Sequence, residues 1–349
     1  MRCRMVDFGV RGPVVANSDG YDELDRQLVH ALHIDGRAPM STLAAVLGVS
    51  DKTLARRYAR LRACGALQVA GVVDPFAVVG QVVWLLRIRC VPSASAAVAE
   101  ALARRPDTLW VSLTSGGTEI TCLVQPEHES DGDALLLQQL PRTSRIESVT
   151  AHYLLHRFIT RAEGLVTKQG PLTADQVAAL RPEVTAGAPT VLEAPDRALL
   201  AVLAADGRAG FAELSAASGL SASAVRRRLH QLRASGALYY EVDFDWRILG
   251  IGIRTLLWLA CEPARIVAIG RELATHPEIA FAGATTGPTN IFASVYSRDQ
   301  QALYSYLTER LVNSPGLLSM ESAPVVRTVK KVVHQPGVTL RGYPSSSSR

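Results

Sequence analysis

The sequence of 349 residues contains few cysteines and no long apolar segment. Its five cysteines stand singly, at positions 3, 64, 90, 122 and 261, with no Cys-x-x-Cys pair and no histidine spacing that would complete a zinc site. No stretch approaches the roughly 18 to 20 uncharged apolar residues that cross a bilayer, and residues 1–17 lack the apolar core of a signal peptide. We therefore expect a cytoplasmic protein with no disulfide, no structural metal and no membrane partner.

The usual marks of an enzyme are also missing. No Ser-His-Asp order, phosphate loop or pair of catalytic carboxylates stands out, so we expect no catalytic residue and no cofactor. The net charge of +5 is too small to identify a nucleic-acid partner by itself, and only the distribution of the charges can do so.

The chain does contain a long internal repeat, because it matches itself at a constant offset of 171 residues. Asp35-Gly36-Arg37 recurs as Asp206-Gly207-Arg208, and Gly65-Ala66-Leu67 recurs as Gly236-Ala237-Leu238. A constant offset indicates a duplication without gaps. Each copy of about 140 residues is long enough for two small domains.

Each copy opens with three predicted helices. Apolar residues at helical spacing indicate the first two, over residues 22–32 and 41–47 and again over 196–203 and 212–218. Gly48 and Gly219 then end the second helix, and a serine two residues later is placed to cap the third. Residues 66–73 and 237–244 follow, and we expect them to form the strand pairs of a small wing.

The third helix of each copy carries most of the positive charge. In the first copy Leu54, Tyr58 and Leu61 form one apolar stripe and basic residues occupy the remaining surface. A single basic face is usually only a solvated one, but its recurrence after the same glycine turn favours a helix-turn-helix that enters the major groove of double-stranded DNA. Arginine suits that place because it binds guanine edges and neutralises phosphates. The predicted DNA-binding residues are Ser50, Lys52, Thr53, Arg56, Arg57, Arg60, Ser221, Ser223, Arg226, Arg227 and Arg228.

The second half of each copy alternates strands and helices in the order βαββαβ, which is typical of a ferredoxin-like domain. In the first copy the expected elements are residues 82–90, 94–104, 108–114, 118–125, 133–140 and 146–156. In the second copy they are residues 253–261, 264–276, 279–285, 290–296, 300–312 and 318–333.

The loop between the second and third strands of each ferredoxin-like domain is a candidate binding site. It offers backbone donors, hydroxyl groups and one acid or amide, which suit a polar small molecule such as an amino acid. A hairpin turn that needs glycine for its geometry explains the same residues equally well. The candidate effector-binding residues are Thr114, Gly116, Gly117, Thr118, Glu119, Thr286, Gly287, Thr289 and Asn290.

These motifs resemble, twice over, those of the Lrp/AsnC, or feast/famine, transcription regulators. The family's turn before the recognition helix is matched by Leu47-Gly48-Val49-Ser50 and its Asp-Gly-Arg motif by residues 35–37 and 206–208. The resemblance implies a winged helix-turn-helix and a ligand-binding domain that drives assembly, with amino acids as common effectors. The family's effector loop usually reads Gly-x-(Tyr or Phe)-Asp, whereas the last two positions here are Thr118-Glu119 and Thr289-Asn290.

We accordingly predict an α+β fold in which two winged helix-turn-helix domains alternate with two ferredoxin-like ligand-sensing domains. Because the copies are fused, one chain is expected to behave as a pseudo-dimer that binds unlike half-sites, and whole chains are expected to form homo-oligomers. The expected segments are an N-terminal extension (1–20), a first DNA-binding domain (21–75), a first ligand domain (80–160), a linker (161–194), a second DNA-binding domain (195–246), a second ligand domain (250–335) and a tail (336–349).

Two other interpretations remain open. Siroheme decarboxylases look like the same two-domain unit in paired subunits, and this enzyme hypothesis predicts a tetrapyrrole cleft with His and Arg side chains and the loss of the basic helices. Five and four basic residues in the two recognition helices speak against it. The third interpretation is an effector-binding or assembly protein in which one copy has lost its DNA contacts.

Overall fold

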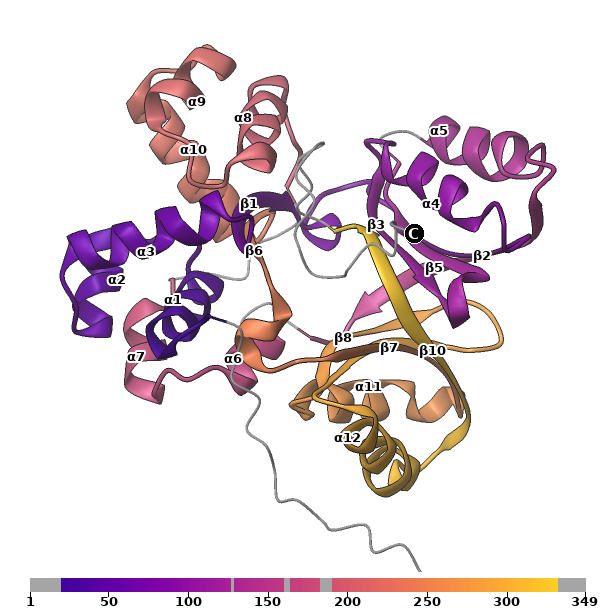
Figure 1. The fold of residues 1–349 in the computed structure, drawn as a ribbon. Coiled ribbons are helices and arrows are strands. Elements are labelled where there is room, and N and C mark those ends of the chain that lie inside the picture. Colours follow the sequence, from indigo (N-terminus) through magenta and orange to yellow (C-terminus); the bar gives the residue numbers. More distant parts are fainter. Residues whose placement is uncertain (1–19, 127–128, 160–163, 183–189, 332–349) are drawn as a thin grey trace, which may run out of the picture.

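The computed structural model describes residues 20–126, 129–159, 164–182 and 190–331 (Figure 1). Except for Gly20, the expected N-terminal extension lies outside these residues, as do the expected tail and parts of the expected linker. No helix among the described residues is long and apolar enough to cross a membrane.

The first three helices of each copy form as predicted. The first three-helix domain contains α1 (Glu23–Ile34), α2 (Met40–Leu47) and α3 (Asp51–Ala63), and the second contains α8 (Ala194–Ala205), α9 (Phe211–Ser218) and α10 (Ala222–Ala234). Gly48 and Gly219 end α2 and α9 in the left-handed region, with φ of 67° and 72°, where a residue without a Cβ has no steric cost. Both turns therefore have the same physical cause.

The expected wings do not form as two separate strand pairs. Residues 66–73 and 237–244 give one strand each, β1 (Leu67–Val73) and β6 (Leu238–Phe244), and these strands pair with each other in antiparallel register. Ala70 lies opposite Glu241, its equivalent in the repeat, so the two-fold relation between the copies passes through this pair. One two-stranded sheet therefore joins the two three-helix domains, as Figure 1 shows.

Arginine side chains add a reciprocal set of contacts between the three-helix domains. The Arg37 guanidinium donates to the carbonyl oxygens of Gly207 and Ala209, both at 2.7 Å. Its equivalent, Arg208, donates in the same way to the carbonyl oxygens of Gly36 and Ala38, at 2.7 and 2.8 Å. Two ion pairs are reciprocal in the same way: Arg62 pairs with Asp206 at 3.1 Å, and its equivalent Arg233 pairs with Asp35 at 2.9 Å. The Asp-Gly-Arg motif thus joins the copies to each other.

The two ferredoxin-like domains also follow the predicted order. The first contains β2 (Trp84–Cys90), α4 (Ser95–Ala103), β3 (Thr108–Thr114), β4 (Glu119–Val124), α5 (Glu129–Asp133) with a π-helical continuation (Ala134–Gln139), and β5 (Ile146–Arg157). The second contains β7 (Ile253–Cys261), α11 (Ile266–Thr275), β8 (Ile279–Thr285), β9 (Ile291–Ser297), α12 (Gln300–Ser305) with a π-helical continuation (Tyr306–Arg310), and β10 (Leu317–Lys330).

The strands of both ferredoxin-like domains close into one eight-stranded barrel, in the order β10-β3-β4-β2-β5-β8-β9-β7. Its two seams, β3 with β10 and β5 with β8, join edge strands of different copies, and Figure 1 shows β10 running from the second domain to the first. The inner faces of the two sheets pack together through large buried side chains: Leu85, Trp110, Leu256, Trp258 and Phe292. The copies therefore form an internal pseudo-dimer at both levels of the fold.

The segment expected to be a linker contains two short helices, α6 (Leu165–Gln169) and α7 (Ala174–Leu180). Val166, Leu172 and Leu180 pack into the core of the first three-helix domain. The Lys168 ammonium donates to three carbonyl oxygens of the second ferredoxin-like domain, those of Ala274, His276 and Ile279, at 3.0, 2.8 and 2.7 Å. This connection therefore bridges two domains that belong to different copies.

Candidate DNA interface and hairpin loops

The predicted recognition helices, α3 and α10, both begin at a capping serine. The Ser50 hydroxyl accepts from the backbone N–H of Thr53 at 3.2 Å, and the Ser221 hydroxyl accepts from that of Ala224 at 3.3 Å. Each bond satisfies a donor at the helix start that has no partner within the helix. The cap also places Thr53 and Ser223 in the first exposed turn, where their hydroxyl groups lie 2.9 and 3.1 Å from those of the capping serines.

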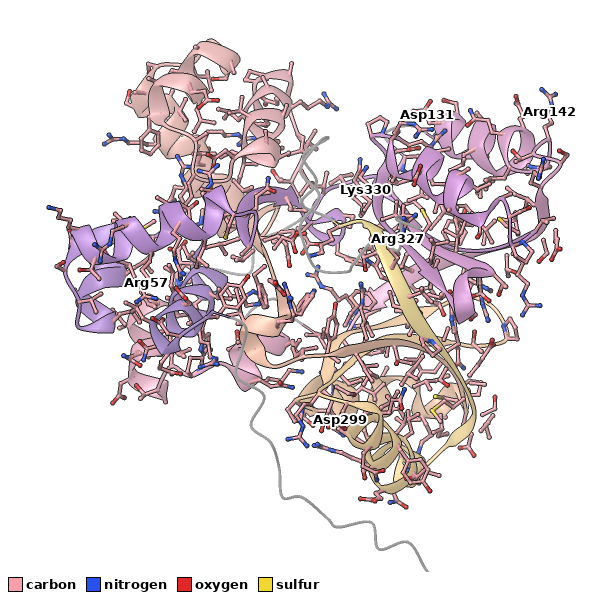
Figure 2. The ribbon with its side chains drawn as sticks, in the orientation of Figure 1. Arg57, Asp131, Arg142, Asp299, Arg327 and Lys330 are labelled. Atoms are coloured by element: carbon pink, nitrogen blue, oxygen red, sulfur yellow. The ribbon has the colours of Figure 1, made fainter. Side chains whose placement is uncertain are left out.

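Two of the predicted DNA-binding residues of α3 point toward α1 instead. Arg57 contacts Asp22 at 2.5 Å and Asp25 at 3.1 Å, and Arg60 contacts Asp25 at 2.5 Å. The Asp25 side chain is fully buried, and Figure 2 shows Arg57 beside α1. These contacts hold the recognition helix against the first helix of its domain.

The second copy repeats this arrangement with a single arginine. Arg228 binds the buried Asp196 carboxylate through two hydrogen bonds of 2.6 Å. Burial alone would raise the pKa of Asp196, but the hydrogen bonds from Arg228 and the backbone N–H of Glu193, together with the charges of Arg228 and Arg197, outweigh it, and the pKa lies below its usual value. A bidentate pair of this kind fixes the relative position of two helices.

The exposed lysine and arginine side chains of the two helices for which no ion pair with another described residue is found are Lys52, Arg56, Arg226 and Arg227. The Arg226 guanidinium lies 4.7 Å from the centre of the Phe211 ring. The sequence pattern thus contains two kinds of arginine that charge alone could not separate. The signal for the inward kind was Asp25 and its equivalent Asp196, which lie at the same distance along the chain from Arg57 and Arg228.

The first candidate effector loop is a tight turn with most of its polar groups engaged. Gly116 and Gly117 have φ of 72° and 88°, a backbone conformation that glycine adopts without strain. Ser115 has φ of 53°, which residues with a Cβ rarely adopt. Thr118 donates to the Ser115 carbonyl oxygen at 2.9 Å. Glu119 is buried and accepts from Arg87 at 2.5 and 3.1 Å.

The second candidate loop is likewise bonded within the protein. The Asn290 amide accepts from the backbone N–H of Cys261 at 2.9 Å and donates to its carbonyl oxygen at 2.7 Å. The Thr286 hydroxyl accepts from the backbone N–H of Tyr153 on β5 at 2.9 Å. The first loop contacts β10 and the second contacts β5, so the two loops lie at different seams of the barrel.

The chain is similar to known transcription regulators. The AsnC-type helix-turn-helix domain matches residues 22–62 and 193–233, and the Lrp/AsnC ligand binding domain matches residues 255–333. An uncharacterized HTH-type transcriptional regulator of Pyrococcus abyssi is 31% identical over 141 residues, which are 40% of this chain and 89% of the relative. The chain belongs to the Lrp/AsnC family. It is a member in which the helix-turn-helix is present twice, as in a tandem duplication.

Other relatives of this Lrp/AsnC protein correspond in length to one copy. The regulator FL11 of Pyrococcus horikoshii is 24% identical over 146 residues, 42% of this chain and 96% of the relative. The siroheme decarboxylase NirDL has a similar structure over both copies, with a TM-score of 0.58, and the match covers 88% of this chain and 92% of that one. Its sequence identity is 15%, so the likeness is one of fold.

Proposed function

We propose that this Lrp/AsnC-type regulator binds an asymmetric operator through α3 and α10 together. The observation that carries the proposal is the pair of serine-capped helices with outward basic residues, held in a fixed relation by the Arg37 and Arg208 contacts. Two recognition helices that are rigidly joined bind DNA at a fixed half-site spacing. Because the exposed residues of α3 and α10 differ, the half-sites should differ too. Chromosomal DNA as the target implies a cytoplasmic location.

The predicted DNA-binding residues divide into two roles in this proposal. Contacts to DNA come from Ser50, Lys52, Thr53, Arg56, Ser221, Ser223, Arg226 and Arg227. The inward arginines, Arg57, Arg60 and Arg228, act instead as positioning residues, because their guanidinium groups already bind Asp22, Asp25 and Asp196.

The test is fluorescence anisotropy of the full chain with DNA from upstream of its own gene and with a scrambled duplex, over a series of salt concentrations. We expect tighter binding to the native duplex, with the logarithm of the affinity falling linearly with the logarithm of the salt concentration. Arg56→Ala and Arg227→Ala should each weaken binding and reduce the salt slope by about one phosphate contact. Equal affinity for both duplexes at every salt concentration would count against an operator-reading role.

Separate charge reversals test whether both copies bind DNA. Arg56→Glu changes only the first recognition helix, and Arg227→Glu changes only the second at the equivalent position. We expect both to weaken operator binding at least about tenfold, since each replaces an attraction to phosphate with a repulsion. If only one of them does so, the other copy serves as a structural or sensing module.

We also propose that a small-molecule effector such as an amino acid modulates DNA binding through the ferredoxin-like domains, at the loops around Gly116 and Gly287. The two loops lie at the seams that join the copies, where a bound molecule would alter the contact between them. The measurement is the anisotropy assay repeated with each amino acid in turn. Thr118→Val and Thr289→Val should reduce the response to the effector and leave basal DNA binding unchanged.

The enzyme alternative is a siroheme decarboxylase, because the siroheme decarboxylase NirDL has a similar fold. It predicts tight binding of an iron tetrapyrrole with a shift of the absorbance spectrum, and no preference for the native duplex. Both recognition helices retain outward basic residues, which this alternative does not require. Absorbance titration with an iron porphyrin, next to the DNA assay, separates the two functions.

We propose finally that whole chains associate into homo-oligomers. Large apolar side chains are exposed on the second ferredoxin-like domain, Tyr304, Val312 and Leu318, each more than half exposed. A contiguous apolar patch is typical of association surfaces, and we assign these three side chains to one. Light scattering after size exclusion should give a mass above 37.5 kDa, and Tyr304→Ser should lower it.

A further inference from the structure

A cavity of about 280 Å³ lies between the shared sheet of β1 and β6 and one side of the barrel. Aromatic side chains from several elements line it, among them Phe76, Trp110, Trp246, Phe281 and Phe292. Sites for drug-sized molecules range from roughly 300 to 1,000 Å³, so this cavity suits a smaller ligand with an apolar body. It is separate from both hairpin loops, and none of their residues lines it.

Asp243 of β6 brings a carboxylate to this aromatic cavity. Its side chain is 5% exposed, and its Oδ1 atom accepts from the Lys331 ammonium at 2.5 Å. The second oxygen, Oδ2, is buried and has no hydrogen-bond partner among the described residues. An unmatched buried acceptor is costly, and native structures contain few of them. Burial raises the pKa of Asp243 to about 6, although Lys331 opposes the shift.

The repeat shows that the fold does not need this charge. The residue equivalent to Asp243 is Val72 in the first copy, which lies on β1 in the same sheet. Arg254, which also lines the cavity, corresponds in the same way to Val83. One copy therefore builds the same strands from apolar residues, and the charges in the second copy need a separate explanation.

The basic groups of the cavity are already engaged. Arg157 pairs with Asp74 at 2.5 Å. Arg254 donates to Ser294 at 3.1 Å, and its guanidinium lies 4.1 Å from the centre of the Trp110 ring. Among the described residues that line the cavity, Asp243 Oδ2 is a buried carboxylate oxygen without a hydrogen-bond partner, and the Tyr240 hydroxyl also has none. The carboxylate is the acceptor of these that carries a negative charge, so it favours a cationic donor.

We propose that this cavity binds a small molecule with a protonated amine on an aromatic body, and that the amine donates to Asp243. The aromatic walls receive the body, and the ammonium group supplies the donor that Oδ2 lacks. Aromatic amines and aromatic amino acids share this chemistry, and they differ in the α-carboxylate. A ligand held here touches both β6 and the barrel, so it joins a three-helix domain to the ligand-binding domains.

The test is isothermal titration of the full chain, without DNA, with phenethylamine, tryptamine, L-phenylalanine, L-tryptophan and 3-phenylpropionate. We expect the amines to bind and 3-phenylpropionate, which has no amine, to give no heat. The two amino acids show whether the site also accepts a carboxylate. The proposal is overturned if no amine or amino acid binds, or if 3-phenylpropionate binds as tightly as phenethylamine.

Variants at Asp243 locate the binding site. Asp243→Val introduces the residue that the first copy has at Val72, and it should weaken amine binding at least about tenfold because a charge-assisted hydrogen bond is lost. The matched control is Asp299→Asn, in the second ferredoxin-like domain (Figure 2), which should leave the affinity unchanged. Unaltered affinity in Asp243→Val would overturn the proposal.

A second variant covers the case in which Asp243→Val does not fold. Asp243→Asn keeps the shape of the side chain, removes its charge and should show the same loss of affinity. A crystal structure with phenethylamine gives an independent answer, since density outside the cavity contradicts the proposal. None of these outcomes bears on DNA reading, because the titrations contain no DNA.

Discussion

Arg37 and Arg208 stand at equivalent positions of the repeat, and each donates two hydrogen bonds to the loop that carries the other. Removing either guanidinium leaves two carbonyl oxygens without these donors and opens the same contact between the three-helix domains. We expect Arg37→Ala and Arg208→Ala each to lower the free energy of unfolding by about 2 kcal/mol. Urea denaturation followed by circular dichroism measures this change.

Coupling between the two arginines gives a sharper form of the same prediction. Since both act on one contact, the double variant should cost less than the sum of the single variants. Lysine should not rescue either position, because one ammonium group cannot reproduce the fork of a guanidinium. Arg271→Ala, on the exposed face of α11, is the control and should change stability by less than about 0.5 kcal/mol. Strict additivity would show that the two arginines act independently.

Arg227 and Arg228 are adjacent in the chain, but their substitution by alanine should have different effects on stability. Arg228→Ala leaves the buried Asp196 carboxylate unpaired and should lower the free energy of unfolding by about 3 kcal/mol. Arg227→Ala should leave stability within about 0.5 kcal/mol of the natural protein, since its side chain is exposed. Thermal and urea unfolding of both variants provide the comparison. A large loss of stability in Arg227→Ala would contradict the division into outward and inward residues.

Acid should weaken the contact between α1 and the linker helices through His30. This side chain is 1% exposed, its Nδ1 atom accepts from the backbone N–H of Leu172 at 3.1 Å, and Nε2 has no partner among the described residues. Burial, aided by the charge of His33, lowers the pKa of His30 to about 4. The unfolded chain therefore binds a proton at higher pH than the folded chain does. The stability from this group is complete above pH 6.5 and is lost as the pH falls toward 4.

Between pH 7.5 and pH 5 this linkage amounts to about 2 kcal/mol. His30→Asn keeps an acceptor for Leu172 and cannot become charged, so its stability should fall by about that much less over the same range. Urea denaturation at the two pH values measures the difference. The exposed His230→Asn is the control, and it should follow the natural protein. Parallel curves for His30→Asn and the natural protein would refute the role of His30.

Lys168 should connect the first three-helix domain to the second ferredoxin-like domain. Its ammonium group donates to three carbonyl oxygens, and Lys168→Met removes all three bonds while preserving most of the side-chain volume. We expect a loss of about 1 to 3 kcal/mol and faster amide exchange in α6. Hydrogen exchange measured by mass spectrometry tests both expectations. An unchanged rate of amide exchange in α6 would show that the apolar contacts of this helix are sufficient to keep it in place without Lys168.

The amino-acid sequence predicted the helices and strands of this fold better than it predicted which of them pack or pair together. The repeat, the three helices and the βαββαβ order could be read from periodicity, because side-chain spacing reports which face of an element is buried. Spacing does not say which strand lies alongside, so the pairing of β1 with β6 and the closure of the barrel were not foreseen. The ordered linker was missed because α6 and α7 are short and owe their burial to distant residues.

The sequence placed the candidate DNA interface on the two basic helices, but it did not separate the outward arginines from the inward ones. Arg56 and Arg57 are adjacent and chemically identical, and only the fold of α1 brings Asp25 to one of them. The cavity beside Asp243 had no counterpart in any motif. The sequence signal for the cavity was a difference between the copies, since the second copy has an acid where the first has Val72. A repeat is recognised from the positions at which its copies agree, so this difference was not considered.

Ala70 and Glu241 are equivalent residues that pair with each other where the two copies meet, so the charge at this position bears on the origin of the fused chain. If two separate second copies paired in this register, Glu241 would lie directly opposite its own counterpart, and like charges in that place repel. The second copy is therefore suited to a partner that has a small neutral residue there, as the first copy does. Once the two halves were joined, a side chain that a symmetric pair of chains would place against its own charge could occur on one side only.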